Sequence, residues 1–152
     1  MVPENIIDRH VDLLSADDDA LERDLELIQH EHPILAAYVL NENSDAFTES
    51  ERALLLFLFT VILRSVKEHQ GTLAKFSADD ISAAEEANYE VLDEQSSRIF
   101  RERITPFFEQ SAEEDLLALL EDAMLDTKEA DVTPEGREPL FVTLKTVIDV
   151  VI

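Results

Sequence analysis

The longest apolar run of the chain extends from Ala53 to Leu63 and is interrupted only by Thr60. Its side chains form a band too wide for one face of a surface helix, so several elements are expected to contact it. Gly71 follows at a position suited to the left-handed stop of a helix. The pattern predicts a buried central helix over about residues 49–70, and half of the band is also compatible with a homodimer interface.

Four sites carry a Ser or Thr that is followed three residues later by an acidic residue. This spacing is the capping-box pattern, in which the hydroxyl accepts a backbone N–H of the first helical turn and the acid reaches back. Because Glu suits the reciprocal role better than Asp, the second and fourth sites are expected to be the stronger ones. The four sites are Ser15/Asp18, Thr48/Glu51, Ser77/Asp80 and Ser111/Glu114.

Apolar residues recur at helical spacing after each of these sites and in two further segments. The further segments predict a first helix over residues 5–14 and a short helix over residues 34–40. The helix after Ser77 is compatible with a continuation past Ile99. Pro106 is expected to end or kink that helix, because proline restricts the residue before it and cannot donate a backbone hydrogen bond.

The last segment, residues 140–152, is rich in β-branched side chains, which are common in strands. Five of its apolar residues nevertheless fall on one helical face, and Pro139 suits the first position of a helix. A lone strand would find no obvious partner elsewhere in the chain, so the segment is expected to be helical. The five residues are Leu140, Leu144, Val147, Ile148 and Val151.

Length and composition are those of one folded domain. The chain has 152 residues, of which 45% are hydrophobic, and this is enough for a core without disulfide staples. The longest apolar run is shorter than the roughly 20 residues that cross a bilayer, so a soluble protein without a membrane span is expected. We therefore expect one all-α domain over residues 1–152, an irregular bundle of six or seven helices around the central helix.

The residue types that are rare in the chain exclude several kinds of chemistry. Cysteine is absent, which excludes thiolate nucleophiles and cysteine-ligated metals. The only two glycines are far apart, so no glycine-rich phosphate-binding loop and no Gly-x-Ser-x-Gly motif can form. The first residues lack a signal-peptide pattern, and the expected location is the cytoplasm.

The charge of the chain is its most unusual property. Asp and Glu number 35 and Lys and Arg only 12, so the formal net charge is -23. A field of this sign opposes nucleic-acid binding and favours a protein partner with a basic surface. Only four of the cations are lysines, and an acidic, lysine-poor surface is also what adaptation to high intracellular salt would produce, since salt screens self-repulsion.

The sequence His30-Glu31-His32 is the most suggestive group of metal-ligand residue types. On a helix, His30 lies above Glu26, while His32 points about 200° away from His30. The two imidazoles cannot then hold one metal ion together, and a solvated helix end is the better interpretation. We therefore predict no metal site from this segment.

Acidic residues are too abundant for any one pair to indicate acid–base catalysis. Glu85, Glu86 and Tyr89 form one candidate group, and Asp93 with Glu94 forms another. Only burial could shift their pKa values towards catalytic use, and the pattern around them favours a solvated acidic face.

Two other charged segments stand out. Arg98, Arg101 and Arg103 form the one locally basic stretch, and we expect them to pair with the protein's own carboxylates. The charged connection over residues 126–139 is long for a loop without structure of its own, and we expect it to be a mobile contact region.

No residue of the sequence is assigned to catalysis, to a cofactor or to a metal. The function expected is that of a non-enzymatic protein-interaction or regulatory domain. Two alternatives remain open: a helical-bundle metal-binding protein or enzyme that uses His and carboxylate groups, and an acidic decoy that mimics nucleic acid for a basic partner.

Overall fold

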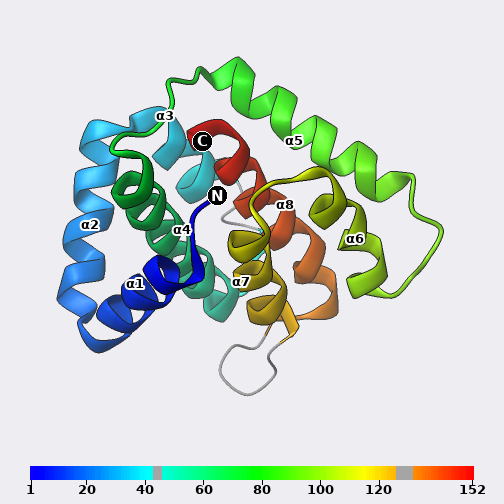
Figure 1. The fold of residues 1–152 in the computed structure, drawn as a ribbon, viewed down its shortest axis with the longest axis horizontal. Helices are drawn as coiled ribbons and strands as arrows, with labels where there is room; N and C mark the ends of the chain where they lie inside the picture. The colour runs from blue at the N-terminus through cyan, green and yellow to red at the C-terminus, as the bar shows by residue number, and fades with distance from the viewer. Residues whose placement is uncertain (43–45, 126–131) are drawn as a thin grey trace.

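The computed structural model describes residues 1–42, 46–125 and 132–152. Within these ranges the chain forms eight α-helices, one π-helical turn and no strand (Figure 1). The all-α class is confirmed, with one helix more than the predicted six or seven. The elements are α1 (Glu4–Ala16), α2 (Asp18–Glu31), α3 (Pro33–Ala37), η1 (Tyr38–Glu42), α4 (Glu49–Gln70), α5 (Ala78–Asp93), α6 (Phe100–Gln110), α7 (Glu114–Leu125) and α8 (Pro134–Val151).

Two helices, α4 and α8, pack against each other at the centre of the bundle (Figure 1). α4 is the predicted central helix, and it also packs against α1 and α2. α8 is buried even more completely, because every residue from Leu140 to Ile148 lies in the interior. α5 covers the outer side of α8, and α7 packs against both α1 and α8. The C-terminal helix is therefore a second central element beside the predicted one.

The helical interpretation of the C-terminal segment is confirmed, but the helix begins earlier than expected. Thr133 caps α8, and its hydroxyl accepts the backbone N–H of Gly136 at 3.0 Å. Pro134 occupies the first helical position, so the prediction that Pro139 begins the helix is wrong. The low helix propensity of β-branched residues costs only about a fraction of a kcal/mol for each residue. Burial of their side chains on nearly all sides of α8 contributes far more, so the segment is helical.

Two of the four predicted capping boxes are confirmed. At the start of α4 the backbone N–H of Glu51 donates to the Thr48 hydroxyl at 3.1 Å, and the Glu51 carboxylate accepts the Thr48 N–H at 2.9 Å. Ser77 and Asp80 make the same reciprocal pair at the start of α5, at 3.2 and 2.9 Å. The expected advantage of Glu over Asp did not decide which boxes form.

The box at Ser15 is wrong because a better cap lies two residues further on. α1 continues to Ala16, and Asp17 caps α2 by accepting the backbone N–H of Ala20 at 3.2 Å. Asp17 is therefore the only residue between the end of α1 and the start of α2, and its short carboxylate can cap α2 from this position.

The box at Ser111 is also wrong. Ser111 is the C-cap of α6, and its hydroxyl accepts the N–H of Glu113 two residues on, while α7 begins only at Glu114. The hydroxyl thus stabilises the connection between two helices and not the first turn of the second one.

The extra helix arises because the chain breaks between α5 and α6. The Ser97 hydroxyl accepts the N–H of Ile99 at 3.1 Å, and the Arg103 guanidinium donates to the carbonyls of Gln95 and Ser97. These local bonds compete with a continuous helix, so the continuation past Ile99 is wrong. Pro106 lies inside α6, which continues to Gln110, so Pro106 does not end a helix, and the alternative that it kinks one stays a prediction.

We expect Ser77→Ala to destabilise the protein by about 1 kcal/mol, because the substitution leaves the first-turn N–H of Asp80 without its acceptor. Urea denaturation followed by circular dichroism would measure the loss, and Ser77→Asp, which restores an acceptor, is the matched control. Equal stability of wild type and Ser77→Ala would contradict the role of the cap.

Candidate functional site

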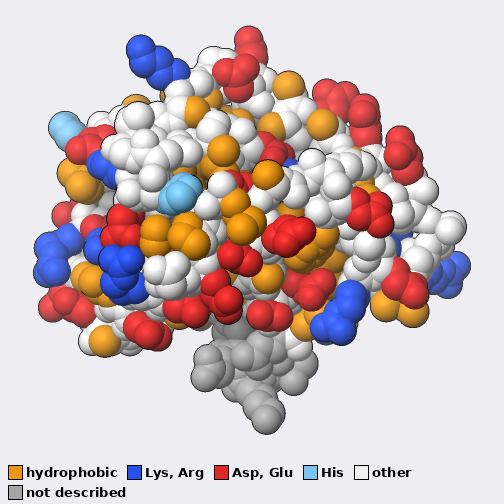
Figure 2. All heavy atoms as spheres, in the orientation of Figure 1, with side chains coloured by type: hydrophobic (Ala, Val, Ile, Leu, Met, Phe, Trp, Pro, Cys, Tyr) orange, Lys and Arg blue, Asp and Glu red, His pale blue; other side chains and the backbone are white. Residues whose placement is uncertain are grey.

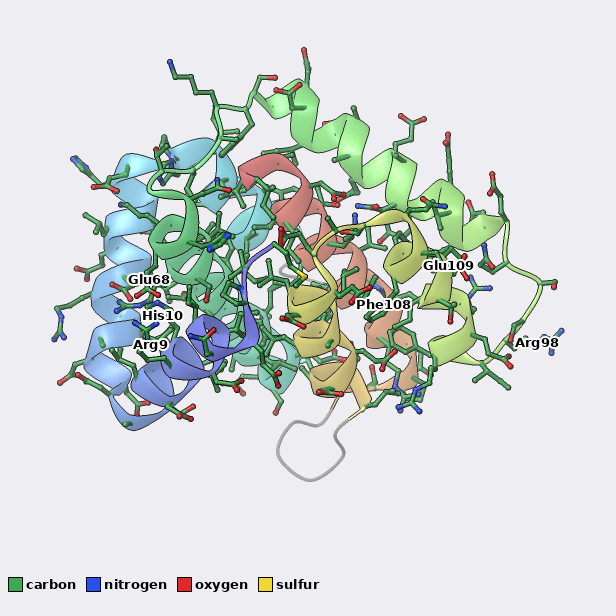
Figure 3. All side chains as sticks on the ribbon, in the orientation of Figure 1. Arg9, His10, Glu68, Arg98, Phe108 and Glu109 are labelled. Atoms are coloured by element: carbon green, nitrogen blue, oxygen red, sulfur yellow. The ribbon has the colours of Figure 1, made fainter. Side chains whose placement is uncertain are left out.

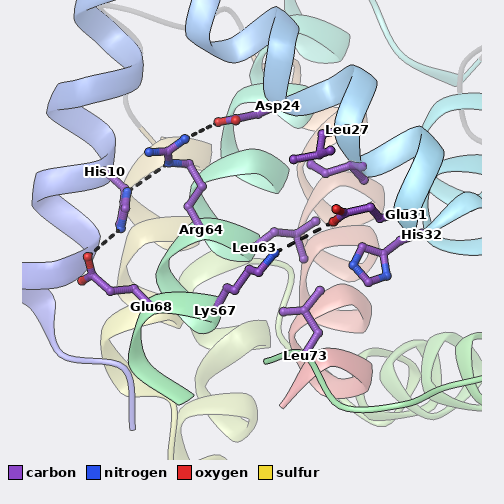
Figure 4. Close-up of a pocket in the computed structure, with 11 residues that line it drawn as sticks. His10, Asp24, Leu27, Glu31, His32, Leu63, Arg64, Lys67, Glu68 and Leu73 are labelled. Carbon is purple, nitrogen blue, oxygen red and sulfur yellow. Dashed lines mark hydrogen bonds and ion pairs between the residues drawn. The ribbon is translucent and has the colours of Figure 1, made fainter. Parts of the chain in front are cut away.

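A pocket of about 320 Å³ lies between α1, α2 and α4 (Figure 4). Its apolar lining consists of Leu27, Ile28, Leu63 and Leu73. Leu27 is 50% exposed, whereas Leu63 is only 5% exposed, so the apolar surface continues from the floor of the pocket to its edge. Charged and imidazole side chains surround this surface, and the pocket can therefore accept an apolar group between polar edges.

The polar end of the pocket is a chain of interactions from three helices (Figures 3 and 4). His10 is 8% exposed, and its Nδ1 accepts a hydrogen bond from Nε of Arg64 at 3.1 Å. Arg64 also donates to Asp24 at 2.5 Å. The other ring nitrogen, Nε2, lies 3.6 Å from Oε1 of Glu68. The Glu68 carboxylate accepts two hydrogen bonds from Arg9, at 2.8 Å on Oε1 and 3.0 Å on Oε2.

The chemistry of His10 follows from this arrangement. Burial lowers the pKa of the imidazole below 6.5, and the neighbouring Arg64 guanidinium lowers it further. The ring is therefore neutral at neutral pH and carries its proton on Nε2, because Nδ1 accepts from Arg64. A histidine whose acceptor nitrogen is already occupied is a poor general base. The interactions of His10 hold α1 and α4 together beside the pocket.

The other end of the pocket contains a looser pair. Nζ of Lys67 lies 3.9 Å from the carboxylate of Glu31, and both side chains are substantially exposed. Such a pair stabilises a protein by at most about 1 kcal/mol, so it can open to admit another charged group. His32, which ends α2 outside helical geometry, also lines this end.

The structure separates the residues of the His30-Glu31-His32 segment. His30 and Glu26 are both exposed on α2, while Glu31 and His32 line the pocket. Among the residues that the structure describes, no group of three or more His, Asp or Glu side chains is arranged to hold a metal ion.

The predicted acidic face on α5 is solvated except at one residue. Glu86, Tyr89 and Glu90 are exposed, but the half-buried Glu85 accepts a hydrogen bond from the hydroxyl of the buried Tyr38. Burial raises the pKa of Tyr38, and the Glu85 carboxylate raises it further, so the phenol stays protonated. Glu85 thus fastens α5 to the core, whereas Asp93 and Glu94 at the C-terminal end of the helix are exposed.

The expectation for the basic stretch is confirmed for two arginines. Arg103 donates to Glu138 at 2.9 and 3.2 Å, and Nε of Arg101 lies 3.8 Å from Glu121. Arg98 is exposed and points away from the body of the protein, with no ion pair to a described residue (Figure 3).

The predicted contact region over residues 126–139 divides into two parts. Residues 126–131 lie outside the part of the chain that the structure describes. From Pro134 onwards the segment is the first turn and a half of α8, so the prediction of a loop there is wrong.

Uncompensated negative charge is concentrated on α5. Residues 76–97 contain seven acidic residues and no Lys, Arg or His, and none of the seven forms an ion pair with a described cation. Red side chains stand along the upper right edge of the space-filling view, over α5 (Figure 2). The seven are Asp79, Asp80, Glu85, Glu86, Glu90, Asp93 and Glu94.

Comparisons with protein-family models, with curated proteins and with solved structures find no match to this chain. None of the described helices is long and apolar enough to cross a membrane. Any functional conclusion therefore rests on the chemistry of the described surfaces and pockets.

The burial of His10 and Lys145, which line the two pockets, was not predicted from the sequence. His10 lies three residues after Ile7 and four before Leu14, both of which are buried, so its place on an apolar stripe was a usable signal. Lys145 lies within the buried run of α8, but a lysine at the edge of an apolar stripe usually extends to solvent, which hid its burial.

Proposed function

We propose that this protein is a non-enzymatic interaction module that binds a partner with a basic surface. The binding surface is the α5 acidic face, which consists of Asp79, Glu86, Glu90, Asp93 and Glu94 around the exposed Tyr89. The observation that supports it is the concentration of unpaired carboxylates on a helix that contacts the rest of the protein along a narrow stripe. The buried residues of that stripe are Ile81, Asn88 and Leu92.

The placement of these acids opposes the stability of α5. Glu90 and Asp93 lie in its last turn and Glu94 is its C-cap, where the helix dipole favours cations, and no basic residue is present there. Glu86, Glu90 and Glu94 also follow each other at intervals of four, so like charges are neighbours on the helix surface. Each unfavourable placement costs about 0.2–1 kcal/mol, and a bound cationic surface would reverse the sign of these terms.

Elsewhere seven of the 12 Lys and Arg side chains form ion pairs with carboxylates of described residues. Arg9 pairs with Glu68, Arg64 with Asp24, and similar pairs involve α6, α7 and α8. The protein thus neutralises part of its charge on other surfaces and leaves α5 without compensation. A partner with clustered Arg or Lys would find there the most complementary surface among the described residues.

Tyr89 gives this surface an anchor beyond charge. Its side chain is 38% exposed, and Glu85, Glu86 and Asp93 lie three or four residues away on the same helix. Burial raises the pKa of Tyr89, and the nearby Glu85 raises it further, so the ring remains neutral. An arginine can stack on this ring while it pairs with a neighbouring carboxylate, a combination that is common at interface hot spots.

The test uses an arginine-rich helical peptide as the probe, titrated calorimetrically at about 0.05 M and about 0.5 M KCl. The variant Glu86→Gln/Glu90→Gln/Asp93→Asn/Glu94→Gln should bind the peptide at least about tenfold more weakly than wild type. The same variant should be at least as stable as wild type, because it removes the unfavourable charges described above.

The matched control removes the same number of charges from exposed positions that form no ion pair with a described residue: Asp8→Asn/Asp12→Asn/Glu22→Gln/Glu26→Gln. If the two variants weaken binding equally, the peptide responds to net charge and the α5 acidic face is not the site. Absence of binding to the wild type at low salt would contradict the proposed function altogether.

A further inference from the structure

A second pocket, of about 400 Å³, lies behind α5 and has no part in the proposed acidic surface. Residues of α5, the C-terminal end of α6, the connection at 111–113 and the last two turns of α8 form its walls. Its most unusual feature is Lys145, whose side chain is only 9% exposed. The pocket has the size of a small-molecule site, which is typically about 300–1,000 Å³.

A lysine at this position does not serve stability well. Nζ of Lys145 donates to Asp149 at 2.5 Å and lies 5.6 Å from the centre of the Phe107 ring. Removing an ammonium group from water costs several kcal/mol, and Asp149 stays partly exposed to water, so the pair offsets only part of this cost. The ammonium group has three N–H donors, and only one has an acceptor among the described residues. The other donors are available to a group in the pocket.

Asn88 supplies the complementary function beside it. The residue is 5% exposed, and its Nδ2 donates to Thr146 at 3.1 Å and to Asp149 at 3.0 Å. The carboxylate of Asp149 can only accept, which identifies the nitrogen of the amide and leaves its carbonyl oxygen, Oδ1, as an acceptor with no described donor. Lys145 and Asn88 therefore donate to the two oxygens of the Asp149 carboxylate. Lys145 retains free N–H donors, and Asn88 retains a free acceptor, its oxygen Oδ1.

The charges at the pocket disfavour a charged ligand. Lys145 and Asp149 balance each other, so an anion would face Asp149 without compensation and a cation would face Lys145. A third charged residue, Glu113, accepts the N–H of Val2 at 3.0 Å and lies 3.7 Å from the terminal amino group. The charge of Glu113 is therefore compensated as well, and a charged ligand would add an unbalanced charge to the pocket.

We propose that this pocket binds a small neutral molecule that bears an amide group on an apolar body. The amide oxygen accepts a hydrogen bond from Nζ of Lys145, and the amide N–H donates to Oδ1 of Asn88. The apolar body lies against Phe107 and Ile148, which line the same pocket. This site is independent of the α5 acidic face, because its two binding residues, Lys145 and Asn88, are buried and the acidic face consists of exposed side chains.

The experiment compares three probes of nearly equal size: benzamide, benzoate and benzylamine. Binding is followed by the backbone amide signals of the ¹⁵N-labelled protein at fixed ionic strength. Benzamide should shift the signals of residues around the pocket in a saturable way and bind about tenfold more tightly than either charged probe, since each of those loses a hydrogen bond and adds an unbalanced charge. Tighter binding of benzoate or of benzylamine would overturn the proposal.

Two variants locate the binding. Lys145→Met keeps the length of the side chain and should reduce benzamide affinity about tenfold. Because a core substitution can impair folding, Ala87→Phe provides a second variant, in which an exposed residue that lines the pocket fills it without altering the Lys145 interactions. Ser82→Phe, on α5 but outside the pocket, is the control and should bind normally. Unchanged binding by Ala87→Phe would show that benzamide binds elsewhere and would overturn the assignment.

Discussion

Gly136→Ala is expected to destabilise the protein by roughly 2–5 kcal/mol, although the same substitution inside a helix usually stabilises. Gly136 occupies the first turn of α8, and its backbone is not in the left-handed region. An added Cβ would lie 1.9 Å from Oε2 of Glu51, which is far inside contact distance. Overpacking therefore outweighs the gain in helix propensity.

Glu51 cannot move aside without loss. It is 2% exposed, and its Oε2 accepts hydrogen bonds from the N–H of Thr133 at 3.0 Å and from the Thr133 hydroxyl at 2.8 Å. Its Oε1 accepts the N–H of Thr48 at 2.9 Å. One carboxylate thus joins the start of α4 to the start of α8, the two central helices. Displacing it leaves buried donors unsatisfied, at about 1–3 kcal/mol each.

A double-mutant cycle tests this explanation directly. In the Glu51→Ala background the clash is absent, so adding Gly136→Ala should be neutral or stabilising by up to about 1 kcal/mol. Urea denaturation at neutral pH measures all four proteins. Equal losses from Gly136→Ala in both backgrounds would contradict a clash with Glu51.

The contribution of Glu51 should also depend on pH. Burial alone would raise the pKa of this carboxyl, but hydrogen bonds from Thr48 and Thr133 outweigh burial and lower it below 4.5. Because the folded-state pKa lies below the unfolded one, the stabilisation is fully present above the unfolded value and disappears as the pH falls through the folded value. The stability difference between wild type and Glu51→Gln should therefore shrink in acid.

Periodicity predicted the fold because most helices bury one clear stripe. The central helix at α4 and the stop at Gly71 followed directly from the apolar run and the single suitable glycine. The errors lie at helix ends, where several side chains compete for the same backbone donors. Asp17 displaced Ser15 as a cap, and Arg103 bonded the carbonyls of Gln95 and Ser97 at a break that no pattern marked. Such competition is decided by tertiary contacts and not by local spacing.

The candidate sites were predicted less well because they depend on burial. The net charge of -23 predicted an acidic surface but not its location. The absence of Lys, Arg and His from residues 76–97 is a signal in the sequence that could have identified α5. His10 and Lys145 acquire their properties from neighbours more than 50 positions away or from the depth of a helix in the core. Neither separation nor depth is visible in a local pattern of residues.

Raising KCl from about 0.1 M to about 2 M is expected to raise the thermal midpoint of unfolding. With a net charge of -23, the acidic side chains lie closer together in the folded state than in the unfolded chain, so their repulsion destabilises the fold. Two like charges about 10 Å apart in water repel by roughly 0.4 kcal/mol, which is small for one pair but adds up over many. The Debye length is about 10 Å at 0.1 M and about 3 Å at 1 M, so molar salt removes most of this repulsion. KCl is preferable to sulfate, which also strengthens apolar burial.

The α5 variant with four neutralised acids separates the two explanations of the acidity. If the protein is adapted to high salt, repulsion is spread over the surface, and the α5 variant and the α1/α2 control should lose equal parts of the KCl dependence. If the charge serves a basic partner, repulsion is greatest on α5, so that the α5 variant should be the more stable at 0.1 M and the less responsive to KCl. A wild-type midpoint that stays flat up to 2 M would contradict the high-salt explanation and the repulsion expected on α5, and peptide binding would then be the remaining test of a basic partner.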